Sequence, residues 1–232
     1  MYEIDTNISE TSKLTNVIIE HPNVLNVLEY FNIPLGLGDK TIAEVAKEHN
    51  IAPNTLEVVI KVYCRAMPNK ILNKKEVHDL LMFLQTSHNN FKLIKIPELK
   101  CLIENFSKEI PTEYGKMMVA FFDEYIQEID EHFMYEDKKV FPYISNILHD
   151  KITKDFKIRE FERNHTDIGH KLLDLKNILI KYIPPTIVSE YRKQILNQLI
   201  SFERDLMYHT QLEDNILVPF VKNMETNIKK NK

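Results

Sequence analysis

An internal repeat with an offset of 77 residues constrains this chain more than any other feature of its sequence. One offset relates four pairs of residues, and residues 128–144 match residues 205–221 in acidic, aliphatic, aromatic and proline positions around them. Chance readily supplies one such His pair, but not the whole set. The repeat predicts two helical hairpins, each with one His on its first helix and His-x-x-x-Glu on its second. The four pairs are His88 with His165, His132 with His209, Glu136 with Glu213, and Pro142 with Pro219.

The composition favours helices, because only four of the 232 residues are glycine and 44% are hydrophobic, whereas sheets need frequent turn residues. We expect an all-α protein with an up-down-up-down four-helix bundle at residues 71–232, preceded by a small helical domain at residues 1–70. In that small domain we expect a turn at residues 32–40 between the first two helices. The long helices are predicted at roughly 75–108 (kinked near Pro97), 112–140, 153–182 and 186–217.

The polar residues of the repeat fall on the apolar stripes of these helices. His132 and Glu136 continue a stripe of Met118, Phe122, Tyr125 and Ile129 in steps of three and four residues. Burying ionised carboxylates costs several kcal/mol each unless a cation compensates, so the pattern predicts an internal metal site. A single His on such a stripe is more often a hydrogen-bonded core residue, but six residues in a two-fold repeat favour ligands. The six candidates are His88, His132, Glu136, His165, His209 and Glu213.

The types of donor indicate which metal the site holds. Imidazoles with bridging carboxylates suit iron, manganese or zinc, and Cys64 and Cys101 show no spacing typical of a thiolate site. Zinc prefers isolated tetrahedral sites, which makes it the least favoured of the three metals. A ferritin-like bundle would carry Glu-x-x-His on two helices, and this chain offers only Glu162 with His165. His21, His49, His78, His149 and His170 have no repeat partner and are predicted to lie outside the site.

With these motifs the sequence resembles the hemerythrin-like proteins, and most closely the two-domain di-iron proteins that repair damaged iron-sulfur clusters. The resemblance implies a bridged pair of iron ions on the six candidate ligands. It also implies a role near the metals for Glu128 and Asp205, which precede His132 and His209 by one turn. These two carboxylates are either hydrogen-bond partners of the ligating groups or solvated surface groups. Oxygen-carrying hemerythrin has an additional His where this chain has Gly169, so oxygen carriage of that kind is not expected.

The resemblance leads to two alternative functions. The first is repair of iron-sulfur clusters or a response to nitric oxide or oxidative stress, and the second is non-catalytic sensing or carriage of oxygen, nitric oxide or iron. Whether the protein is an enzyme stays open between them. The small domain of the repair proteins usually has adjacent cysteines after its first helix, and this chain has Gly36-Leu37 there. Thiol chemistry attributed to that domain is therefore absent.

Charge and targeting signals limit the partners and the location. The net charge of −4 gives no broad basic surface for nucleic acid, and no apolar run approaches the length of a membrane helix. We expect a cytoplasmic protein whose partners are a small ligand such as oxygen or nitric oxide, iron-sulfur proteins and a second copy of the chain. A third alternative is DNA binding, because residues 41–56 have a helix-turn-helix rhythm. The segment 41–67 has no net charge, which argues against that alternative.

Overall fold

The chain is all-α, as its sequence predicts. The computed structural model describes residues 8–66, 68, 71–151, 156–164 and 170–230, and within them the backbone forms helices and no strand. The one extended pairing in this part of the chain is an isolated bridge between Lys13 and Thr41. No helix among the described residues has the length and apolar character needed to cross a membrane.

Contacts between residues divide the chain into two compact units. Unit 1 comprises Met1–Ser87, Phe141–Glu162 and Tyr208–Lys232, and unit 2 comprises His88–Val140 and Arg163–Met207. The predicted division into residues 1–70 and 71–232 stays a prediction. In unit 1 the N-terminal helices pack on the first long helix through aromatic contacts. The ring centroid of Phe83, on the long helix, lies 5.4 Å from that of Tyr30 and 6.2 Å from that of Tyr63.

The N-terminal region of unit 1 contains α1 (Leu14–Glu20), α2 (Val24–Tyr30), α3 (Ile42–Glu48) and α4 (Pro53–Tyr63). The turn at residues 32–40 therefore lies between the second and third helices, and the prediction that it joins the first two was wrong. The reason is Pro22, because a residue before proline is disfavoured in helical conformation and α1 ends just before His21. A capping box begins α3, in which Glu44 N–H donates to the Thr41 hydroxyl and Thr41 N–H donates to Glu44.

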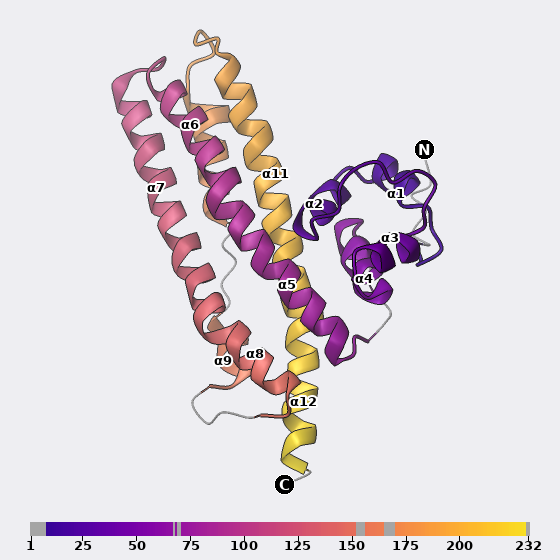
Figure 1. The fold of residues 1–232 in the computed structure, drawn as a ribbon. Helices are drawn as coiled ribbons and strands as arrows, with labels where there is room; N and C mark the ends of the chain where they lie inside the picture. Colours follow the sequence, from indigo (N-terminus) through magenta and orange to yellow (C-terminus); the bar gives the residue numbers. More distant parts are fainter. Residues whose placement is uncertain (1–7, 67, 69–70, 152–155, 165–169, 231–232) are drawn as a thin grey trace. The chain divides into compact units, whose positions relative to one another are not determined.

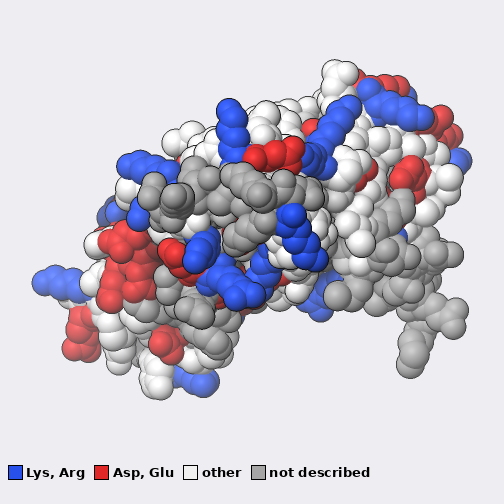
Figure 2. All heavy atoms as spheres, turned by 90° about the horizontal axis from the view of Figure 1, so that it is seen from below, with Lys and Arg blue, Asp and Glu red and all other residues white. Residues whose placement is uncertain are grey.

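The second helix of the helix-turn-helix rhythm is buried over most of its length. Every residue of α4 from Thr55 to Tyr63 is buried in unit 1. Two of its charged residues pair with each other, since Lys61 Nζ lies 2.6 Å from Glu57 Oε1. A recognition helix must present side chains to a groove of DNA, and α4 presents none from Thr55 to Tyr63. The face drawn in Figure 2 carries Lys and Arg side chains alongside Asp and Glu side chains rather than one sign of charge.

The first long hairpin runs through α5 (Lys74–Asn90), a π-helical segment η1 (Phe91–Lys95), α6 (Ile96–Ser107), α7 (Thr112–Tyr135), η2 (Glu136–Val140) and α8 (Phe141–Leu148). The second runs through α9 (Ile158–Asn164), α10 (His170–Asn177), η3 (Ile178–Tyr182), α11 (Glu190–Leu212), η4 (Glu213–Leu217) and α12 (Val218–Lys230). The prediction ended two of these helices at residues 140 and 217, but α8 and α12 continue them. Residues 153–155 and 165–169 of the third predicted helix, 153–182, lie outside the described part.

The π-helical segments have a local cause in the sequence. In η1, η2 and η4 the last residue is followed by an X-Pro pair, ending in Pro97, Pro142 and Pro219. Proline has no N–H to donate, and its ring clashes with the carbonyl four residues earlier. A widened turn before the proline accommodates both defects without ending the helix. The π-helical segment η1 lies just before Pro97, where the sequence predicts a kink, and η2 and η4 begin at Glu136 and Glu213.

The core of unit 2 follows the predicted stripes. Met118, Phe122, Tyr125 and Ile129 of α7 are buried against the matching stripe of α11. Figure 1 shows α6, α7 and α11 running alongside one another in this unit. The stripe of α11 that packs in this core consists of Ile195, Leu199, Phe202 and Leu206.

Replacing Gly115 with alanine should destabilise the protein, although the same change usually stabilises a helix. Replacing a glycine inside a helix with alanine usually stabilises a protein by about 1 kcal/mol. Here a Cβ atom would lie 2.6 Å from the backbone oxygen of Ser107 at the α6–α7 turn. We expect Gly115→Ala to lower the free energy of unfolding by about 1–3 kcal/mol, measured by urea denaturation. Lys116→Ala at the neighbouring exposed position should change it by less than about 0.5 kcal/mol, and a stabilised Gly115→Ala protein would contradict the close approach.

Candidate metal centre

The carboxylate of Glu136 lies between two histidine rings of unit 2. Its Oε2 atom is 3.2 Å from Nε2 of His88, and its Oε1 atom is 3.0 Å from Nε2 of His132. The Glu136 and His88 side chains are fully buried, and His132 is 13% exposed. His132 and Glu136 meet because residues four apart share a helix face. Each carboxylate oxygen therefore faces a different imidazole, which is the arrangement a bridging carboxylate needs.

Unit 1 contains the matching pair of the second repeat. Nε2 of His209 lies 3.3 Å from Oε1 of Glu213, and both side chains are buried. As in the first repeat, the glutamate is the first residue of a π-helical segment that follows a long α-helix. Glu136, His209 and Glu213 are buried and His132 is partly buried, whereas their role as metal ligands stays a prediction.

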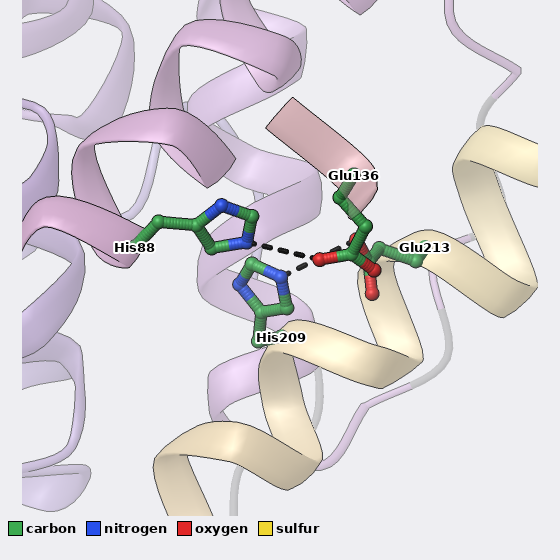
Figure 3. Close-up of side chains that lie close together, drawn as sticks. All are labelled: His88, Glu136, His209 and Glu213. Carbon is green, nitrogen blue, oxygen red and sulfur yellow. Dashed lines mark ion pairs between the residues drawn. The ribbon is translucent and has the colours of Figure 1, made fainter. Parts of the chain in front are cut away.

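Four of the six predicted ligands offer atoms that come together. His88, Glu136, His209 and Glu213 each contribute one ligand atom, and these atoms all lie within 4.8 Å of one another. Figure 3 shows the two rings and the two carboxylates directed at one another, with the His88–Glu136 and His209–Glu213 ion pairs drawn as dashed lines. All four residues are buried. Two carboxylates and two imidazoles at this distance can surround one cation.

The ring nitrogens that face away from this group are also engaged. Nδ1 of His88 lies 2.8 Å from Oδ1 of Asp137, whose other oxygen lies 3.3 Å from Nζ of Lys92. Nδ1 of His209 lies 2.9 Å from the hydroxyl of Ser87, and that hydroxyl donates to the carbonyl of Leu84. Each Nε2 is therefore left facing a glutamate. This pattern is typical of metal-ligating histidines, whose second nitrogen is held by a neighbouring acceptor.

The charges around His88 shift two pKa values. Burial alone would lower the pKa of His88, but hydrogen bonds with Asp137 and Glu136 outweigh burial and raise it. Burial alone would raise the pKa of Asp137, but its contacts with His88 and Lys92 outweigh burial and lower it. Both shifts favour the charged forms, because each group has an opposite charge beside it.

The remaining predicted residues have different environments. His165 lies outside the described residues, so its place as a ligand stays a prediction. Asp205 is buried and pairs with Lys95 at 2.5 Å, whereas Glu128 occupies an exposed position of α7. Their predicted role beside the metals stays a prediction. His149, predicted to lie outside the site, is exposed and contacts the backbone oxygen of Ser145.

Sequence reasoning missed the two residues that hold the outer nitrogens, Asp137 and Ser87. A signal for Asp137 was present, because Asp follows Glu in both copies of the repeat, as Asp137 and Asp214. Ser87 gives no such signal, since the residue 77 positions later is Asn164.

The residues of this group fit a metal ion with nitrogen and oxygen ligands. Buried ionised carboxylates are stable only when paired or bound to a cation, and each imidazole presents Nε2 to a carboxylate. Cys64 is buried and burial raises the pKa of its thiol to about 12, which disfavours the thiolate form. The donor set therefore suits iron, manganese or zinc without sulfur.

A comparison with protein families agrees with this donor set. Residues 93–221, more than half of the chain, match the model described as the hemerythrin HHE cation-binding domain. The chain belongs to this hemerythrin family. Five of the six predicted ligands lie inside the matched range, and His88 lies just before it.

Relatives of this hemerythrin-family chain match over most of its length. A "probable iron-sulfur cluster repair protein" of Haemophilus influenzae is 24% identical, covering 91% of this chain and 96% of its own length. The "iron-sulfur cluster repair protein YtfE" of Pectobacterium carotovorum is 21% identical, covering 89% and 94%. The protein of the same name from Salmonella schwarzengrund is 21% identical, covering 78% and 83%. The predicted resemblance to hemerythrin-like and cluster-repair proteins is thus confirmed.

The glutamates provide the test of the ligand assignment. Glu136→Gln and Glu213→Gln keep the side-chain shape but remove the negative charge that offsets a cation, so each variant should retain iron at least about tenfold more weakly than wild type. Retained iron is measured by elemental analysis after dialysis against a chelator without air. His149→Gln, at an exposed histidine, is the matched control. Equal iron in all of these proteins would show that the two glutamates are not ligands.

Proposed function

We propose that this hemerythrin-family chain binds two iron ions and acts in the repair of iron-sulfur clusters under nitrosative or oxidative stress. The observation that carries the proposal is the Glu136 carboxylate, whose two oxygens face the Nε2 atoms of two different histidines. A carboxylate placed in this way can bind two neighbouring ions at once. The names of the relatives, which cover up to 91% of the chain, support the cluster-repair part of the proposal.

The repeat supports the proposed count of two ions. His88 and His209 lie in one group with both glutamates. The offset of 77 residues relates His88 to His165 and His132 to His209. It also relates Glu136 to Glu213, so both glutamates belong to either group. A second group of His132 and His165, sharing both carboxylates, therefore follows from the same pattern. When bound, the iron pair would supply electron transfer and coordination positions for a small ligand such as nitric oxide or oxygen.

The protein's own residues have defined tasks in this proposal. Glu136 and Glu213 would neutralise the cations, and the imidazoles would hold them through Nε2. The ring of Phe133 stacks on His88 at 4.0 Å between centroids, and hydrocarbon against this ring strengthens its charge interactions. Iron-sulfur proteins are the proposed macromolecular partners, and a cytoplasmic location stays the prediction from the sequence.

A second candidate function is reversible binding of oxygen, nitric oxide or iron without turnover. One observation favours it, because Gly36 occupies the turn in which the repair proteins usually carry adjacent cysteines. Its φ angle is +104°, a conformation that glycine adopts and that side-chain-bearing residues rarely do. The turn is therefore built for glycine at this position, and the N-terminal region offers no thiol pair there.

One experiment distinguishes the two functions. An enzyme whose iron-sulfur cluster has been damaged by nitric oxide is incubated without air with the iron-loaded protein, and recovery of its activity is followed. We expect recovery with wild type and at least about tenfold slower recovery with Glu136→Gln. Optical spectra of the iron-loaded protein with and without nitric oxide are recorded in parallel. Reversible spectral change without any recovery of the enzyme would contradict repair and favour the binding function.

A further inference from the structure

The contact between His88 and Asp137 fixes which ring nitrogen of His88 carries the proton. A neutral imidazole has one N–H, and an ionised carboxylate only accepts hydrogen bonds. Because Nδ1 lies 2.8 Å from Oδ1 of Asp137, the proton belongs on Nδ1 when Nε2 binds a metal. The ring of Phe133 stacks on His88 at 4.0 Å between centroids. The Asp137 contact and the stacked ring together hold the Nε2 lone pair toward Glu136.

Lys92 reaches the other oxygen of the same carboxylate. It follows His88 by four residues on one continuous helical stretch, and its Nζ lies 3.3 Å from Oδ2 of Asp137. The Lys92 and Asp137 side chains are 28% and 34% exposed, whereas His88 is buried. The three groups form a chain from solvent to the buried ring. The Lys92 ammonium offsets part of the negative charge of Asp137 that the imidazole would otherwise experience, because both groups contact the same carboxylate.

His209 provides a contrast inside the same protein. Its Nδ1 contacts the hydroxyl of Ser87, and that hydroxyl donates its proton to the carbonyl of Leu84. The hydroxyl oxygen therefore accepts a hydrogen bond from the His209 ring. His209 thus takes the same tautomer as His88, but its partner is neutral. A carboxylate partner raises the basicity of a ligating imidazole more than a hydroxyl does.

We propose that Asp137 is a positioning residue that holds His88 in its metal-binding tautomer and strengthens it as a donor, while Lys92 limits that effect. The inference rests on the proposed function, since it supposes a metal ion at His88 and Glu136. Asp137 follows Glu136 directly, so the ligand and the residue that orients the neighbouring ligand come from one helical turn. Its charge strengthens the bond from His88, and its removal weakens metal binding without removing a ligand.

Iron affinity of the full chain is the first measurement. Asp137→Asn keeps the shape and an acceptor oxygen but removes the charge, so its Fe²⁺ affinity, measured by competition with a coloured chelator without air, should fall about 10- to 100-fold. Lys92→Met keeps an unbranched side chain of similar length but removes the ammonium, which lies 5.5 Å from the centroid of the Phe133 ring, and it should shift the affinity the opposite way. Asp130→Asn, an equal charge change at an exposed position of α7, should stay within about twofold of wild type. The proposal is overturned if Asp137→Asn matches Asp130→Asn, or if Lys92→Met weakens binding as much as Asp137→Asn does.

A spectroscopic measurement separates this proposal from the proposed function. In protein loaded with diamagnetic Zn²⁺ and labelled with ¹⁵N-histidine, His88 should show a proton on Nδ1 at low field, as a carboxylate acceptor produces. That signal is assigned by its loss in His88→Gln and should move upfield in Asp137→Asn but not in Asp130→Asn. A wild type that binds neither Fe²⁺ nor Zn²⁺ would defeat the proposed function. A wild type that binds metal while Asp137→Asn leaves the His88 signal unchanged would defeat this inference alone.

Discussion

The structure depends on two buried glutamates that each sit beside an imidazole in an apolar interior. Glu136 and Glu213 have no exposed surface, and moving an ionised carboxylate out of water costs several kcal/mol without compensation. His88 and His132 provide partial compensation for Glu136, but each provides charge only when protonated. A metal ion compensates fully while leaving the rings neutral, so its binding contributes directly to the stability of the folded state.

The backbone is adapted to these glutamates at the same points. Both begin a π-helical segment, and both segments end before an X-Pro pair, as the repeat offset requires. π-helical turns inside α-helices are rare and occur frequently at functional sites. Pro142 and Pro219 therefore favour a widened helical turn at the positions where the Glu136 and Glu213 carboxylates enter the core.

The sequence predicted the parts of this protein that periodicity controls. The His-x-x-x-Glu spacing and the 77-residue repeat were sufficient to find His88, Glu136, His209 and Glu213, because spacing on a helix determines which side chains share a face. Contacts that depend on packing between elements were not accessible in this way. The hydrogen bond from His88 to Asp137 joins α5 to η2. Pro22 separates α1 from α2, so the turn at residues 32–40 comes one helix later than predicted. The close approach of Ser107 reverses the effect expected for an alanine at Gly115.

Anomalous scattering at the iron edge from crystals of the iron-loaded full chain tests the central claim most directly. The account predicts two peaks about 3.5–4 Å apart, one of them within bonding distance, roughly 2.0–2.2 Å, of Nε2 of His88 and Nε2 of His209. Both peaks should also contact the carboxylate of Glu136. Iron bound elsewhere on the chain, with these four residues facing one another around no metal, would contradict it.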